Sequence, residues 1–128
     1  MGIALKNIGK LDDAICSYRH AITLEPDYFD AHYNLGIALE SRCETSAAIL
    51  SYKKASELNL QAAEVNNNLG TALQKTGDLV SALDYFRKAV IIRPTYTDAN
   101  FNMGIILMAQ IELKAAISSY QELSLIHI

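Results

Sequence analysis

A pattern of small residues recurs every 34 residues along most of this 128-residue chain. Leu35-Gly36, Leu69-Gly70 and Met103-Gly104 share one phase of the pattern, and Gly2 falls at the same phase upstream. A fixed period of this length is typical of stacked supersecondary units. The chain is therefore expected to bury its apolar residues between neighbouring repeats and not in one globular core.

Each repeat continues with an alanine and with an aromatic residue four positions later. Residues at this spacing lie on one face of a helix, so these aromatic residues are expected to be part of the core. Pro26 and Pro94 then end two of the repeats. The alanines are Ala14, Ala48, Ala82 and Ala116, the aromatic residues are Tyr18, Tyr52, Phe86 and Tyr120, and a second small position holds Ala21, Ala55, Ala89 and, out of pattern, Leu123.

This order of Leu-Gly, Ala, aromatic residue, Ala and Pro resembles the tetratricopeptide repeat, a helix-turn-helix unit, over nearly the whole chain. The resemblance implies an all-α fold, an α-solenoid of stacked helix pairs that forms a right-handed superhelix. Leu60 and Ile128 depart from it, since proline is typical at their positions. The expected units are a partial repeat at 1–28 and repeats at 29–62, 63–96 and 97–128, the last with a tail that looks non-native.

The positions of the turns follow from glycine and proline. We expect Gly9 to turn the chain between a short first helix and a second one, as Gly77 does later. Cys43 takes the place of a turn glycine, which predicts strain if a positive φ is required there. Asp27 with Asp30, and Thr95 with Asp98, have the spacing of helix-capping pairs. The expected helices are Leu11–Leu24, 29–41, 47–59, 63–76, 79–92, 97–110 and one from Leu113 onward.

Composition disfavours several classes of function. A net charge of −3 gives no general attraction for nucleic acids or anionic membranes. No apolar run approaches the roughly 20 residues of a membrane span. Cys16 and Cys43 lie at unrelated phases of the repeat, which favours a reducing compartment, so we expect a cytoplasmic protein. Neither a phosphate-binding loop nor a nucleophile motif is present in the sequence, so we expect no enzyme activity in this chain and no cofactor.

The candidate binding site is a row of asparagines on the first helix of each repeat. In the tetratricopeptide family this helix lines the concave surface, so the resemblance implies that Asn34, Asn68 and Asn102 face a groove. A primary amide can pair with both the N–H and the C=O of an extended peptide. The alternative is structural, since such an asparagine can be simply exposed or can bond to a neighbouring helix. The other expected contacts are Tyr33, Ile37, Asn67, Thr71, Lys75, Phe101 and Ile105.

Other polar rows have simpler explanations. Asp30, Glu64 and Asp98 lie in first helical turns, where negative charge offsets the helix dipole. A carboxylate clamp for chaperone C-termini, a second class within the family, needs several basic residues on this face, and Lys75 is the one clear candidate. Cys16 and His20 could share a helix face, but a metal site needs more ligands, so no metal is expected. A basic row on the second helices comprises Arg19-His20, Lys53-Lys54 and Arg87-Lys88.

Two functions remain open from the sequence. One is a protein-interaction scaffold that holds an extended polypeptide in the groove through the asparagines. The other is the substrate-recruiting, non-catalytic segment of a larger enzyme, because the asparagine row resembles that of protein O-GlcNAc transferases. Self-association through uncapped ends of the array is also expected, since both ends expose apolar faces.

Overall fold

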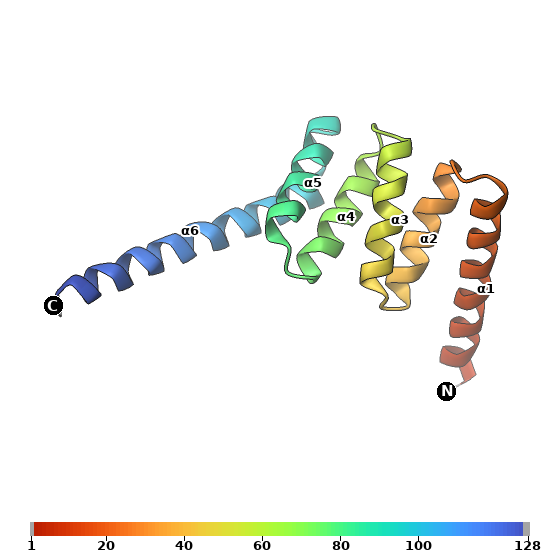
Figure 1. Ribbon diagram of the computed structural model, residues 1–128, viewed down its shortest axis with the longest axis horizontal. Helices are drawn as coiled ribbons and strands as arrows, with labels where there is room; N and C mark the ends of the chain where they lie inside the picture. Colours follow the sequence, from red (N-terminus) through yellow and green to blue (C-terminus); the bar gives the residue numbers. More distant parts are fainter. Residues whose placement is uncertain (1, 127–128) are drawn as a thin grey trace.

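The computed structural model describes residues 2–126, with side chains described from Gly9 to Leu123. Within residues 2–126 the chain forms six α-helices and no strand, which confirms the all-α prediction. Helices α2 to α5 stand side by side, and α1 packs against α2 (Figure 1). The helices are α1 (Gly2–Leu24), α2 (Phe29–Ser41), α3 (Thr45–Leu58), α4 (Ala63–Lys75), α5 (Leu79–Ile92) and α6 (Thr97–Ile126).

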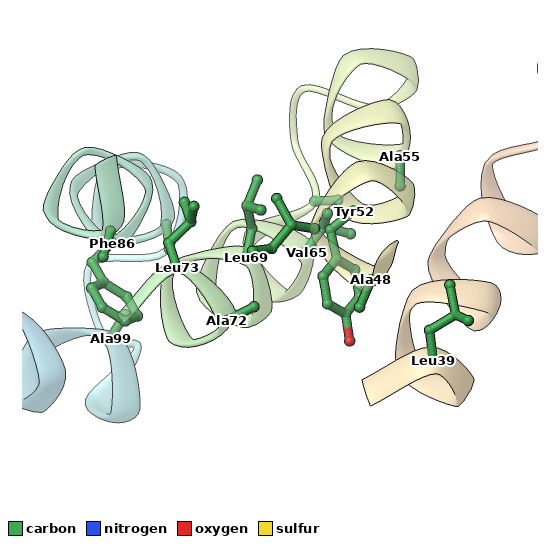
Figure 2. Packing of buried hydrophobic residues seen from close by; sticks show 14 of the residues in the cluster. Leu39, Ala48, Tyr52, Ala55, Val65, Leu69, Ala72, Leu73, Phe86 and Ala99 are labelled. Carbon is green, nitrogen blue, oxygen red and sulfur yellow. The ribbon is translucent and has the colours of Figure 1, made fainter. Parts of the chain in front are cut away.

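The core lies between successive helices, as expected for a stack of repeats. Val65, Leu69 and Ala72 of α4 are fully buried on one face of the helix. Their side chains lie between Tyr52 of α3 and Phe86 of α5 (Figure 2). Each large apolar side chain buried in this way contributes about 1.5–3 kcal/mol to folding. The interior of the array is thus a continuous seam and not a single central core.

An aromatic ring lies against a glycine in each of the two complete helix pairs. A Cβ atom added at Gly36 would lie 2.5 Å from Cε1 of Tyr52, and one added at Gly70 would lie 2.7 Å from Cε1 of Phe86. Both distances are shorter than real Cβ contacts, so only glycine leaves room for the ring. We call the surface of a first helix at its Leu-Gly or Met-Gly glycine the glycine notch. In the two complete helix pairs this notch is filled by an aromatic ring of the second helix.

The two ends of the chain differ from the prediction. Gly9 does not turn the chain, because α1 runs without interruption from Gly2 to Leu24. Glycine permits a turn but does not impose one, and inside a helix it costs only about 1 kcal/mol relative to alanine. At the other end, the predicted helices 97–110 and 113 onward are one helix, α6. Ile111 stands at the phase of Cys43 and Gly77, and a β-branched residue strongly disfavours the left-handed conformation that the turn requires.

Two predicted caps are also wrong. Tyr28 and not Asp27 occupies the N-cap position of α2, and no side chain caps the helix there. Helix α6 begins at Thr97, so Thr95 lies too far upstream to be its cap. Asp78 caps α5 by its side chain, because its Oδ1 accepts a hydrogen bond of 3.2 Å from the backbone N–H of Ser81.

The length of helix α6 bears on the expectation that no segment spans a membrane. Its segment Thr97–Leu123 is long and apolar enough to cross a bilayer by length and composition, since its most apolar stretch of 18 residues has a mean hydropathy of 1.2. The segment reaches this length because two repeat helices are joined without a turn. A single helix of this kind is weak evidence for membrane insertion.

The turn between α2 and α3 holds Cys43 in the left-handed region, with φ of 64°, where Gly77 has φ of 87° in the next repeat. This confirms the predicted strain. Replacing Cys43 with glycine is expected to raise the free energy of unfolding by about 0.5–1 kcal/mol. The relief of roughly 1–2 kcal/mol in the folded chain exceeds the extra entropy that glycine loses on folding, about 0.5–1 kcal/mol. Thermal denaturation followed by circular dichroism measures the gain.

The matched control for this substitution is Cys43→Ala, which removes the thiol but keeps a Cβ atom at positive φ. It is expected to give no gain in stability. Gly77→Ala is expected to lower the stability, because it introduces the same strain one repeat later. Equal melting temperatures for Cys43→Gly and Cys43→Ala would show that the backbone at residue 43 is not strained.

Candidate functional site: the asparagine face of α2, α4 and α6

The three predicted asparagines lie at the same phase of three first helices, Asn34 on α2, Asn68 on α4 and Asn102 on α6. Asn34 is exposed, and Asn68 and Asn102 are half-buried, so each is accessible to solvent. We call the surface that carries them, with the neighbouring residues of the same helices, the asparagine face. The face combines contributions from successive repeats, because α4 contacts α6 and is linked to α2 by side-chain hydrogen bonds.

Asn68 shows how much of an amide remains available on this face. Its Nδ2 donates a hydrogen bond of 3.3 Å to the Tyr33 hydroxyl of the preceding repeat. An amide has two N–H donors and a carbonyl oxygen that accepts. Within residues 9–123 the second N–H and the oxygen of Asn68 make no hydrogen bond, so one donor and one acceptor remain. That is the same pair of groups that each residue of an extended peptide presents.

The predicted contact Asn67 lies differently from its neighbours. It is buried, and its Oδ1 is a buried side-chain atom without a hydrogen-bond partner in the described part of the chain. Its backbone oxygen accepts a hydrogen bond of 3.0 Å from Oγ1 of Thr71, another predicted contact, which is half-buried. Asn67 therefore lies beneath the surface next to the asparagine face, and its side chain is not accessible on that face.

The apolar residues predicted for this face have two different environments. Tyr33 is half-buried and stacks on Phe29, with 6.0 Å between the two ring centroids. The ring centroid of Tyr33 also lies 6.2 Å from that of Tyr52. Ile37, Ile105 and Phe101 are exposed, and Phe101 shows 67% of its surface. The two kinds of residue suit different roles, since a fixed aromatic ring gives a rigid wall and exposed side chains give contact area.

The electrostatics of the face are close to neutral around Lys75. Its Nζ lies 3.4 Å from Oε2 of Glu40, and Oε1 of Glu40 accepts a hydrogen bond from the hydroxyl of Tyr52. Burial, with the hydrogen bond to Glu40 and its negative charge, raises the pKa of the Tyr52 hydroxyl well above its ordinary value. The sequence analysis missed Glu40, although its place four residues after Gly36 puts it next to the ring in the notch. Lys75 is therefore not a free cation for an anionic ligand.

The acidic row has a structural role at its central position. Glu64 lies in the first turn of α4 and forms an ion pair with Arg93, the residue that follows α5. The hydrogen bond from Arg93 holds the pKa of the Glu64 carboxyl below its ordinary value. The guanidinium of Arg93 also lies 5.0 Å from the ring centroid of Tyr96. Glu64 and Arg93 thus tie the start of α4 to the segment that leads into α6.

The described residues offer few groups for a metal site or for a cluster of free basic side chains. Cys16 and His20 are exposed on α1, and residues 9–123 contain no group of three His, Cys, Asp or Glu side chains that could hold a metal ion. In the basic row, Lys54 lies 3.8 Å from Asp27 and Lys88 lies 3.4 Å from Asp84. These pairs are exposed and are worth about 0–1 kcal/mol each.

Comparison with protein families assigns the repeats. Residues 2–41 match a family described as TPR repeat, and residues 63–96 match one described as tetratricopeptide repeat. The chain is built from tetratricopeptide repeats. Residues 63–96 are the same unit that the period of the sequence delimits. No curated protein sequence in the comparison matches the chain.

Solved structures support the same assignment. A crystal structure of MamA is 26% identical, covers 94% of this chain and 70% of its own, and superposes with a TM-score of 0.78. The first tetratricopeptide domain of Spaghetti (RPAP3), bound to the HSP90 peptide SRMEEVD, is 20% identical, with coverage of 86% and 87% and a TM-score of 0.76. The type III secretion translocator chaperone SycD of Yersinia enterocolitica is 16% identical, with coverage of 84% and 79% and a TM-score of 0.75. The last two likenesses show the shared fold alone.

Proposed function

We propose that this tetratricopeptide array is a protein-interaction module that binds an extended segment of another protein along the asparagine face. The observation that carries the proposal is the state of the amides. Asn34, Asn68 and Asn102 are accessible, share one phase on successive first helices, and in Asn68 leave one donor and one acceptor without a partner. Paired groups of this kind recognise a peptide backbone whatever its side chains.

The surroundings of the amides favour an uncharged, extended ligand. Ile37, Ile105 and Phe101 offer apolar contact, and Lys75 is already engaged by Glu40. The RPAP3 domain, which shares the fold, is bound to the HSP90 peptide SRMEEVD, which is acidic. A clamp for such carboxylates needs free basic side chains, so we infer that this array reads backbone amides and not a terminal carboxylate.

The alternative, a substrate-recruiting segment of a larger O-GlcNAc-transferase-like enzyme, uses the same face in the same way. It rests on the resemblance of the asparagine row. Because both functions need the same groove, binding experiments on this chain do not separate them. The full sequence of the parent gene does. A catalytic domain there would favour the enzyme, and its absence would favour a scaffold.

The test is the triple substitution Asn34→Ala, Asn68→Ala and Asn102→Ala. Binders are first selected from an unbiased peptide library, and their affinities are then measured by fluorescence anisotropy. If each amide contributes about 1 kcal/mol net, the triple variant is expected to bind about a hundredfold more weakly. Helicity is expected to persist, because alanine is the better helix former.

The matched control is Gln61→Ala, which removes an exposed amide in the turn before α4 and is expected to leave the affinity unchanged. A selected peptide with N-methylated backbone amides is expected to lose binding, whereas one with substituted side chains at alternate positions is expected to keep most of it. Unchanged affinity in the triple variant would remove the asparagine row from the function of the protein.

A further inference from the structure

Among the residues whose side chains the structure describes, three glycine notches recur, and two of them are filled. Tyr52 fills the notch at Gly36 and Phe86 fills the one at Gly70, and each ring comes sixteen residues after its glycine. At Gly104, the third notch, an added Cβ atom would meet no atom within 4 Å among the described residues. The ring at the matching position, Tyr120, is 73% exposed on the far half of α6.

The empty notch is part of an open, mostly apolar depression of about 560 Å³ on the first half of α6. Gly104, Phe101, Ile105 and Met108 contribute to its lining. The depression is larger than three others on the described surface, which have volumes of about 420, 430 and 290 Å³. It therefore has room for a ring of the size that the other two notches receive.

A second pair of positions repeats the mismatch. Leu39 of α2 and Ile49 of α3, like Leu73 of α4 and Leu83 of α5, are buried in the shared core. Their counterparts in the last repeat, Leu107 and Ile117, are both exposed. The two halves of α6 thus carry the complementary surfaces of one helix pair, and in the straight helix these surfaces do not meet.

The helix cannot bring its own surfaces together while it is straight. Sixteen residues at 3.6 residues per turn place Tyr120 about 160° around the helix axis from Gly104. The two surfaces therefore face nearly opposite sides of α6. Ile111, at the position where the other repeats turn, favours the straight helix.

We propose that the glycine notch at Gly104 binds residues 113–123 of a second copy of this chain, with the Tyr120 ring of that copy in the notch. Because the two surfaces lie on opposite sides of each helix, one symmetric pair of straight helices cannot bury both surfaces of both copies. The contact is therefore head to tail, and each added copy leaves one notch and one segment open. The assembly grows with concentration and does not stop at a dimer.

Sedimentation velocity over a wide range of concentrations tests the proposal on the full chain. The average mass of the wild-type chain is expected to increase with concentration. Gly104→Leu is expected to remain a single chain, because its side chain fills the notch and its Cβ atom meets nothing among the described residues of the free protein. Because this variant adds apolar surface, non-specific association would make it associate more strongly than the wild type. The proposal expects the opposite, a loss of association. A wild-type chain that stays monomeric, or a Gly104→Leu variant that still grows, would overturn the proposal.

A mixing experiment makes the test specific to the two surfaces. Tyr120→Ser retains the notch and loses the ring, whereas Gly104→Leu retains the ring and loses the notch. Each variant alone is expected to be monomeric, and the equimolar mixture is expected to form a species of two chains that does not grow further. Ile91→Ser, which removes an equally exposed apolar side chain from α5, is the control and is expected to associate like the wild type. A mixture that stays monomeric would contradict the pairing.

The double substitution Ile111→Gly and Glu112→Asp copies the Gly77-Asp78 turn and lets residues 113–123 fold back within one chain. It is expected to give a monomer at all concentrations, with Tyr120 protected from solvent. If the wild type already shows this protected monomer, closure within the chain replaces the proposal. The alanine triple variant of the asparagine face is expected to associate normally, so a failure of the assembly and a failure of peptide binding remain distinguishable.

Discussion

Replacing Phe86 with alanine is expected to lower the free energy of unfolding by about 3–5 kcal/mol, the usual cost of emptying a fully buried aromatic site. The ring of Phe86 has no exposed surface and occupies the notch at Gly70, between α4 and α5. Its removal leaves a cavity that the neighbouring helices cannot close, because their backbones are held apart by the rest of the seam. Urea denaturation followed by circular dichroism measures the loss.

Gly70→Ala then tells whether the ring and the glycine act together. In the wild-type chain this substitution is expected to cost about 1–3 kcal/mol, since the new Cβ atom collides with the ring. In the Phe86→Ala background the ring is absent, so alanine is expected to stabilise the helix by up to about 1 kcal/mol. The sign of the effect reverses between the two backgrounds.

Gly104→Ala provides the matched control, because Gly104 has the same phase but no ring in its notch. At concentrations too low for association it is expected to stabilise the chain in either background. An equal cost of Gly70→Ala with and without Phe86 would show that the ring does not depend on the glycine, and the double-mutant cycle would then give no coupling energy.

Alkaline pH is expected to destabilise the array, with Tyr52 as the largest contributor. Burial and the Glu40 carboxylate raise the pKa of Tyr52 in the folded state, whereas in the unfolded chain it titrates near 10. Between these values the unfolded chain binds fewer protons than the folded one, so stability is complete below about pH 10 and falls above it. Above about pH 10 the free energy of unfolding is expected to fall by about 1.4 kcal/mol per pH unit from this residue alone.

The variant Tyr52→Phe isolates this contribution, because it keeps the ring in the notch at Gly36 and removes the hydroxyl. Its free energy of unfolding is expected to fall less steeply than that of the wild type above pH 10. The remaining fall includes Tyr33 and Tyr96, whose pKa values are also raised, chiefly by burial. Parallel curves for the two proteins from neutral to alkaline pH would show that Tyr52 is not the titrating group.

The sequence predicted the middle of the array well because the periodic positions there hold side chains that pack directly against one another. Gly36 with Tyr52, and Gly70 with Phe86, are pairs in which neither residue type is replaceable without a clash or a cavity. The residues at the turns restrict the conformation of the chain less strictly. Gly9 can adopt a helical conformation as readily as a left-handed one, and the period alone cannot tell which of the two the chain takes.

The candidate site was predictable in position but not in exposure. The phase of Asn68 identified the face, yet only the structure shows that Tyr33 uses one of its amide hydrogens. Asn67, one residue earlier, was expected to contact the peptide at the edge of the groove, and it is buried. A helical wheel gives direction around one axis, whereas burial depends on how the neighbouring repeat is placed, and that depends on packing between helices.

The ring in each filled notch also acts as a spacer, and this affects the curvature of the whole array. The size of the ring sets how far apart the two helices of a repeat stand, and a solenoid adds the same small rotation at every unit. Exchange of tyrosine for phenylalanine at one such position is a small local change, but its effect on pitch accumulates with the number of repeats. Variation at these buried sites would therefore adjust the curvature of the binding surface without altering any residue that touches a ligand.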